Sequence, residues 1–127
     1  MLKRIFTSAA VLALFALPLA AQAAAPKPPA GDEMTITGQV IDVYCNTTMG
    51  ASGPGHKACA EACAKAGEAL AIEASDGTIY LPVGSKPADP QNPRLLPFAE
   101  GRVKVTGTHR LNHGLHTIEI KTIAAAT

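Results

Sequence analysis

Polar and apolar residues alternate along much of the chain after residue 33, the pattern of strands with one buried face. In the first such segment the apolar side recurs at every second residue, namely Met34, Ile36, Gly38 and Val40. Beyond Val40 the phase slips, and the apolar set becomes Ile41, Val43 and Cys45. Asp42 is then expected to face away from the core. A slip near a glycine predicts a bulge or sharp bend in one long strand, followed by a loop over residues 46–55.

The same alternation predicts four further strands, over residues 69–74, 78–83, 102–109 and 115–123. The tripeptides at 75–77 and 112–114 each end in glycine and are typical of hairpin turns. Four prolines between residues 84 and 97 limit that connection to a short helical turn near 95–99. Residues 124–127 are expected to fray.

One stretch instead follows the period of a helix, from about His56 to the glycine at 67. Charged residues recur every fourth position on one side of it, as on a solvated face: Lys57, Glu61 and Lys65. On the other side Cys59 and Cys63 are one turn apart, with His56 just above them on the same stripe. Gly67 is suited to a left-handed helix cap.

Taken together, these elements predict a mainly β domain over residues 33–124. Five short antiparallel strands with a bent first strand are close to the smallest way to close a sheet and remove its edges. We therefore expect an OB-like barrel with one helix between the first and second strands. An OB-fold normally carries its helix between the third and fourth strands, so the helix position departs from the usual topology.

The first residues predict an export signal rather than part of the fold. Lys3 and Arg4 precede an apolar run at 5–16, and Ala21-Gln22-Ala23 fits signal peptidase. We predict a signal peptide over residues 1–23, a flexible proline-rich lead over 24–32, and a periplasmic or secreted bacterial protein. The apolar run is too short to span a membrane, and no cysteine follows the cleavage site to accept a lipid. No membrane anchor is therefore expected.

Charge and composition narrow the function further. Two of the 11 basic residues lie in the predicted signal peptide, so nine remain against ten acidic ones. This balance gives no reason to expect nucleic acid as a partner, and only three aromatic residues follow residue 23. The core must therefore rest on Val, Ile and Leu. Paired carboxylates, a serine nucleophile motif and a phosphate loop are all missing, so we do not expect an enzyme.

All three cysteines and one of the four histidines fall within residues 43–67. Thiolates and imidazole suit Zn(II), and thiolates suit Cu(I). If Cys45 folds back against the helix, four ligands converge on one tetrahedral ion: Cys45, His56, Cys59 and Cys63. The pattern is not Cys-x-x-Cys-His, so covalent haem attachment is not supported.

The simpler alternative to a metal site is a disulfide bond, which can form in an exported protein. Cys45 would bridge to Cys59 or Cys63 and contribute on the order of 3 kcal/mol, whereas two cysteines one helical turn apart do not pair with each other. The chain would then be a non-catalytic binding module for a partner in the cell envelope. One cysteine would be left over, and a redox or nucleophilic thiol is a third possibility.

Other polar residues have weaker functional signals. Three histidines lie around the last predicted turn: His109, His113 and His116. His109 and His116 can be neighbours on paired strands, and they would then offer a second, weaker metal site. Solvated side chains are the more common outcome. Asp42 is expected to accept hydrogen bonds from the following loop. Alternatively, it would hydrogen-bond to His56 and orient this ligand without binding the metal itself.

Several segments resemble a family of small secreted bacterial proteins that have an OB-like domain and no assigned function. The similarity covers nearly the whole predicted domain and is carried by these motifs: Gly38-x-Val40-x-Asp42-x-x-Cys45, His56-x-x-Cys59-Ala60-x-x-Cys63, Asp76-Gly77-x-x-Tyr80 and Gly101-x-Val103-x-Val105-Thr106-Gly107. The cysteine and histidine spacing is the most specific part. The resemblance implies a fold and a site, and it names no reaction.

Overall fold

The computed structural model describes residue 27 and residues 29–127 of the chain. The predicted signal peptide, residues 1–23, lies outside this part, as do residues 24–26 and 28 of the predicted lead over 24–32. Within the described part, no helix is both long enough and apolar enough to cross a membrane.

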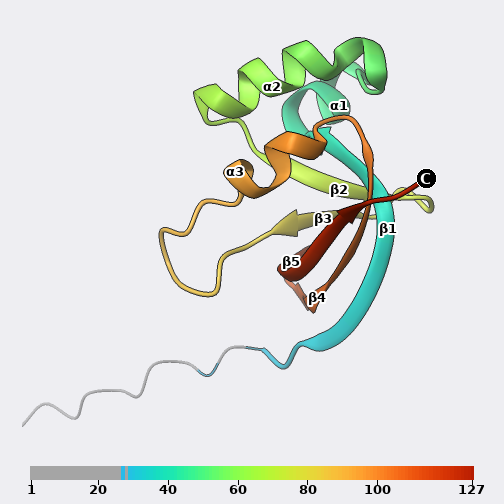
Figure 1. Ribbon diagram of the computed structural model, residues 1–127. Coiled ribbons are helices and arrows are strands. Elements are labelled where there is room, and N and C mark those ends of the chain that lie inside the picture. Colours follow the sequence, from blue (N-terminus) through green and yellow to red (C-terminus); the bar gives the residue numbers. More distant parts are fainter. Residues whose placement is uncertain (1–26, 28) are drawn as a thin grey trace, which may run out of the picture.

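Five strands form one closed barrel in the order β1-β2-β3-β5-β4 (Figure 1). Their bounds are β1 Asp32–Asp42, β2 Leu70–Ala74, β3 Ile79–Pro82, β4 Arg102–Asn112 and β5 Leu115–Ala125. The predicted mainly β, OB-like closed barrel is confirmed. The prediction that all pairs are antiparallel is wrong, because β3 and β5 pair in parallel. The long connection after β3 and the β4–β5 hairpin return β5 to the side of β3 in the same direction.

The barrel interior is filled by aliphatic side chains, as the shortage of aromatic residues predicts. Eight of these buried residues are Ile36, Val40, Leu70, Ile72, Val103, Val105, Ile118 and Ile120. Tyr80 is the buried aromatic residue of this cluster. Burial of the branched aliphatic side chains, worth about 1.5–3 kcal/mol each, is what holds the barrel closed.

Gly38 stands where β1 pairs with both of its neighbours, opposite Ala74 of β2 and Val103 of β4. A Cβ at this position would overlap the carbonyl oxygen of Glu73. We expect Gly38→Ala to lower the free energy of unfolding by about 2 kcal/mol, because the backbone must move to relieve the overlap. Urea unfolding measures this loss. The control is Gly55→Ala, whose added Cβ meets no atom within 4 Å; an equal loss in both variants would contradict this explanation.

The first strand ends earlier than the sequence pattern suggests. It stops at Asp42, and residues 43–49 form α1 (Val43–Met49) in place of a continuing strand and a loop. The Asp42 carboxylate caps this helix by accepting a hydrogen bond from Cys45 N at 2.9 Å, and Gly50 closes it in a left-handed conformation. Asp42 is fully buried, so the expectation that it faces away from the core is also wrong.

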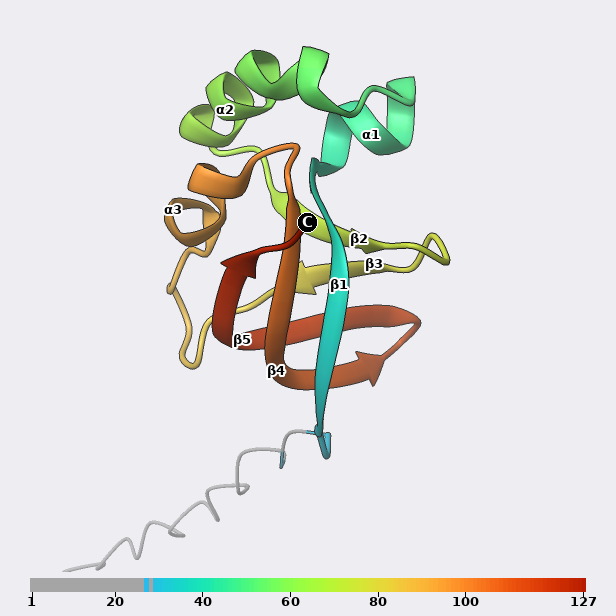
Figure 2. The same cartoon turned by 45° about the vertical axis from the view of Figure 1, so that its right-hand side comes forward.

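The second helix is close to its prediction. A 3-10 turn, η1 (Pro54–His56), leads into α2 (Lys57–Ala66), which ends at the predicted left-handed Gly67. The single-helix prediction is wrong, because α1 and α2 both lie between β1 and β2, and α3 (Asn92–Leu95) with η2 (Leu96–Phe98) lies between β3 and β4. The predicted fraying also begins too early, since β5 runs to Ala125. Figure 2 shows α1 and α2 together over the end of the barrel that β1 reaches.

Candidate metal centre

Three cysteines meet where α1 lies beside α2. Cys45 comes from α1, and Cys59 and Cys63 come from successive turns of α2. Their Sγ atoms all lie within 4.8 Å of one another, and all three are free thiols. Cys45 is buried, Cys63 is half-buried and Cys59 is exposed. The cluster is therefore anchored in the protein on one side and open to solvent on the other.

Local structure explains why the cysteines converge. The Asp42 cap starts α1 so that Cys45 falls within its first turn, on the buried side. Val43 N donates to the Ala69 carbonyl at 3.0 Å, which ties the start of α1 to the chain just beyond α2. The spacing of four within α2 then aligns Cys59 and Cys63 along one face.

Burial and negative neighbours disfavour the thiolate forms of Cys45 and Cys63. Burial raises the pKa of the Cys63 thiol to about 12, and the nearby Asp42 carboxylate and Cys59 raise it as well. Burial is also the main cause that raises the pKa of Cys45, with the Asp42 charge second. A negative neighbour disfavours a thiolate by itself and favours a cation bound to that thiolate. The arrangement therefore suits a metal ion better than a free nucleophilic thiolate.

The raised pKa predicts slow alkylation of Cys63 in the metal-free protein. Only the thiolate reacts, and a pKa well above the ordinary cysteine range leaves little thiolate at pH 8. We expect iodoacetamide to modify Cys63 about tenfold more slowly, or slower still, than in urea-unfolded chain, with a rate that keeps rising above pH 9. Peptide mass spectrometry over time measures the rate, and equal rates in folded and unfolded chain would contradict the prediction.

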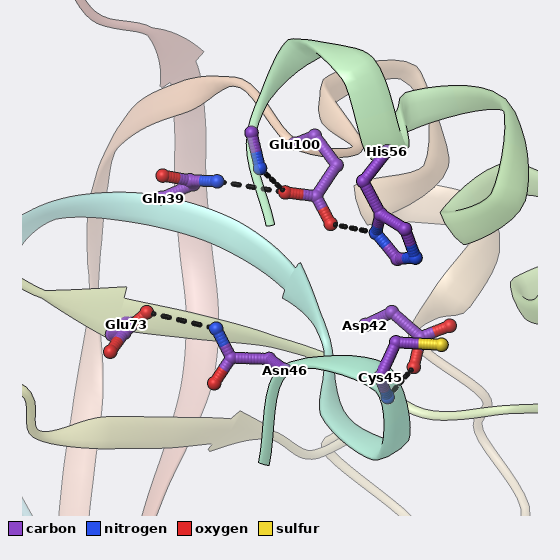
Figure 3. A network of polar contacts seen from close by, with 8 residues as sticks. Gln39, Asp42, Cys45, Asn46, His56, Glu73 and Glu100 are labelled. Atoms are coloured by element: carbon purple, nitrogen blue, oxygen red, sulfur yellow. Dashed lines mark hydrogen bonds and ion pairs between the residues drawn. The ribbon is translucent and has the colours of Figure 1, made fainter. Parts of the chain in front are cut away.

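His56 lies at the junction of η1 and α2, and its side chain is only 12% exposed. Its Nδ1 is 2.9 Å from the Glu100 carboxylate, whereas its Nε2 is buried with no hydrogen-bond partner. Figure 3 shows the ring above Asp42 and Cys45, with the Nε2 edge turned toward their side. His56 is not among the groups within 4.8 Å, so the structure brings together three of the four predicted ligands.

Glu100 is a residue of this site that the sequence did not reveal. Its side chain is fully buried and accepts hydrogen bonds from Gln39 Nε2 at 2.8 Å and Gly53 N at 2.6 Å, besides its contact with His56. Its backbone is left-handed, with φ of 58°, which is strained for a residue with a side chain. The acid follows an apolar stretch directly before a strand, which is a weak signal for a buried carboxylate.

Two buried polar atoms beside the cysteines lack partners, Asp42 Oδ2 and His56 Nε2. Within the described residues, Arg110 Nε is the one other buried side-chain polar atom in this condition. An unpaired buried group costs about 1–3 kcal/mol, and a cation would compensate a carboxylate oxygen and an imidazole lone pair alike. Three sulfur donors and an imidazole nitrogen fit a soft or borderline metal ion.

Comparison of the chain with protein-family models, curated proteins and solved structures finds no match. The resemblance to small secreted bacterial proteins therefore stays a prediction, and the case for function depends on the geometry of the site.

Proposed function

We propose that this is an exported, non-catalytic protein that binds one Zn(II) or Cu(I) ion through Cys45, Cys59 and Cys63, with His56 as fourth ligand, in metal handling at the cell envelope. The main support is the approach of three thiols from two helices, all within 4.8 Å of one another. The two unpartnered atoms beside them give independent support.

Tetrahedral zinc would require only a small contraction of the cluster. With Zn–S bonds of about 2.3 Å, sulfurs bound to one ion lie about 3.8 Å apart. The cysteines therefore need to approach one another by about 1 Å at most, which side-chain rotation in Cys59 and Cys63 can provide. Cu(I) would be satisfied by three thiolates alone.

Glu100 prepares His56 for this role. A carboxylate only accepts hydrogen bonds, so the neutral His56 ring carries its hydrogen on Nδ1 and leaves the lone pair on Nε2. This carboxylate–histidine pairing is the usual way in which proteins fix the tautomer of a metal-binding histidine. His56 must still move toward the sulfurs, and the fixed tautomer ensures that the correct nitrogen arrives.

The exposure of Cys59 favours an ion that can be exchanged. A metal-bound sulfur that faces solvent can be reached by a competing thiolate, which is the form of cysteine that binds metals. Here one ligand faces solvent while Cys45 is buried, so a partner or acceptor can reach the ion from one side. This asymmetry is the basis for proposing metal handling in place of a purely structural role.

A second candidate is the disulfide-stapled binding module for a cell-envelope partner. The same closeness of Cys45 to both other cysteines favours it, because a small movement in an oxidising compartment would let two of the sulfurs bond. The thiols are free in the structure, which is the state that metal binding requires.

Mass and metal content together separate the two candidates. Protein purified from the cell envelope without chelator should contain one ion per chain, and after chelation it should accept three alkyl groups without reduction. A mass deficit of two hydrogens with a single alkylated cysteine would establish the disulfide instead.

His56→Ala should lower the metal affinity and leave a disulfide unaffected, while unchanged affinity would remove His56 from the ligand set.

A further inference from the structure

Two histidines contact each other on β4 and β5, strands that carry no cysteine. His109 of β4 and His116 of β5 lie diagonally across the hairpin, since His109 pairs with Ile118 and His116 with Leu111. The distance from His109 Nε2 to His116 Nδ1 is 3.0 Å. The two rings stack with a 16° interplanar angle and centroids 5.1 Å apart.

The surroundings fix the pair and leave it open to solvent on one side. The buried Tyr80 ring makes a T-shaped contact with each imidazole, with centroids 5.5 Å and 5.4 Å away. Both histidines are half-buried, and His116 lines a cavity of about 490 Å³ together with Leu115 and Ile79. An ion therefore has a route to the pair.

The distance between the nitrogens already suits a shared ion. Two nitrogens bound about 2.0–2.1 Å from one metal lie roughly 2.9 Å apart at a right angle and roughly 3.3 Å apart in a tetrahedron. The observed 3.0 Å falls within this range. Insertion of an ion thus requires the rings to turn until both lone pairs converge, with little change in their separation.

We propose that His109 Nε2 and His116 Nδ1 form a second, exchangeable site for a borderline divalent cation, Zn(II) or Cu(II), with water completing the coordination shell. Without metal, one of the two nitrogens donates its hydrogen to the other. When the ion binds, that hydrogen moves through water to the second nitrogen of its own ring, and both facing nitrogens become metal ligands. No proton is lost or gained in this exchange, and the cysteine site is not required for it.

Zn(II) is the appropriate probe because it does not oxidise the thiols. The full chain is titrated to two equivalents while long-range nitrogen NMR spectra follow every imidazole nitrogen. Among the histidines of the β4–β5 hairpin, we expect Zn(II) to shift His109 Nε2 and His116 Nδ1 most strongly and to leave His113 unchanged, whichever equivalent occupies the pair. His113 is the matched reference because it lies at the exposed turn of the same hairpin.

Variants give the second measurement. His109→Asn and His116→Asn should each weaken Zn(II) binding at this pair by about tenfold or more, since even loss of an outer-shell partner typically costs ten- to a hundredfold. His113→Asn should bind like the original chain. The proposal is overturned if neither facing nitrogen shifts, or if His113→Asn weakens binding equally. The titration of the unmodified chain decides the matter even if a variant unfolds.

Discussion

Adding Zn(II) to the metal-free chain is expected to raise its free energy of unfolding by about 4 kcal/mol once the free ion exceeds its dissociation constant a thousandfold. The gain arises because α1 and α2 bring the three sulfurs together only in the folded state. The ion also supplies a counter-charge beside the buried Asp42 carboxylate. Urea unfolding followed by circular dichroism, with and without Zn(II), measures the difference.

Cys59→Ser is the sharpest variant for this test. Cys59 is exposed, so its replacement should change the stability of the metal-free chain by no more than about 0.5 kcal/mol. It should nevertheless lower the Zn(II) affinity by about a hundredfold and remove most of the stabilisation. Ala62→Ser is the control, because it places the same hydroxyl on an exposed position of α2. Equal stabilisation in Cys59→Ser and the original chain would mean that the ion binds elsewhere.

The fold was predictable where short-range rules decide it. Alternation located all five strands, and Gly67 marked the end of α2 as predicted. The alternation failed at Asp42, because an acid inside an apolar run fits both an outward strand position and a helix N-cap. Only the packing of α1 beside α2 distinguishes the two. The parallel β3–β5 pair depends on how distant segments meet, which no local pattern records.

The sequence was enough to predict that the three cysteines meet, but not that the Glu100 carboxylate contacts His56. Helical spacing places Cys59 and Cys63 on one face, and Cys45 joins them as predicted. Glu100 is 44 residues from His56 in sequence, and its left-handed backbone carries no signal without a glycine. The contact between Glu100 and His56 forms only in the folded chain, where the start of β4 lies beside η1. A buried carboxylate of this kind is a long-range feature, which single-sequence reasoning does not reach.

Glu100→Ala is expected to lower the free energy of unfolding by about 3 kcal/mol or more. The change leaves donors from Gln39, Gly53 and His56 without their acceptor in a buried place, at about 1–3 kcal/mol for each. It should also weaken Zn(II) binding ten- to a hundredfold, because the His56 ring loses the contact that sets its tautomer and orientation. Urea unfolding of the metal-free protein gives the first value, and competition with a zinc indicator gives the second.

The two measurements, the free energy of unfolding and the Zn(II) affinity, distinguish a role of Glu100 in positioning His56 from a purely structural role. Glu61→Ala provides the matched control, since Glu61 makes only a long contact of 3.9 Å with Lys57 on the surface of α2. That variant should change stability by about 0.5 kcal/mol or less and leave Zn(II) binding unchanged. If Glu100→Ala loses stability while its folded form still binds Zn(II) as tightly, Glu100 supports only the fold. His56 would then approach the sulfurs without its help, and the cysteines alone would account for the affinity.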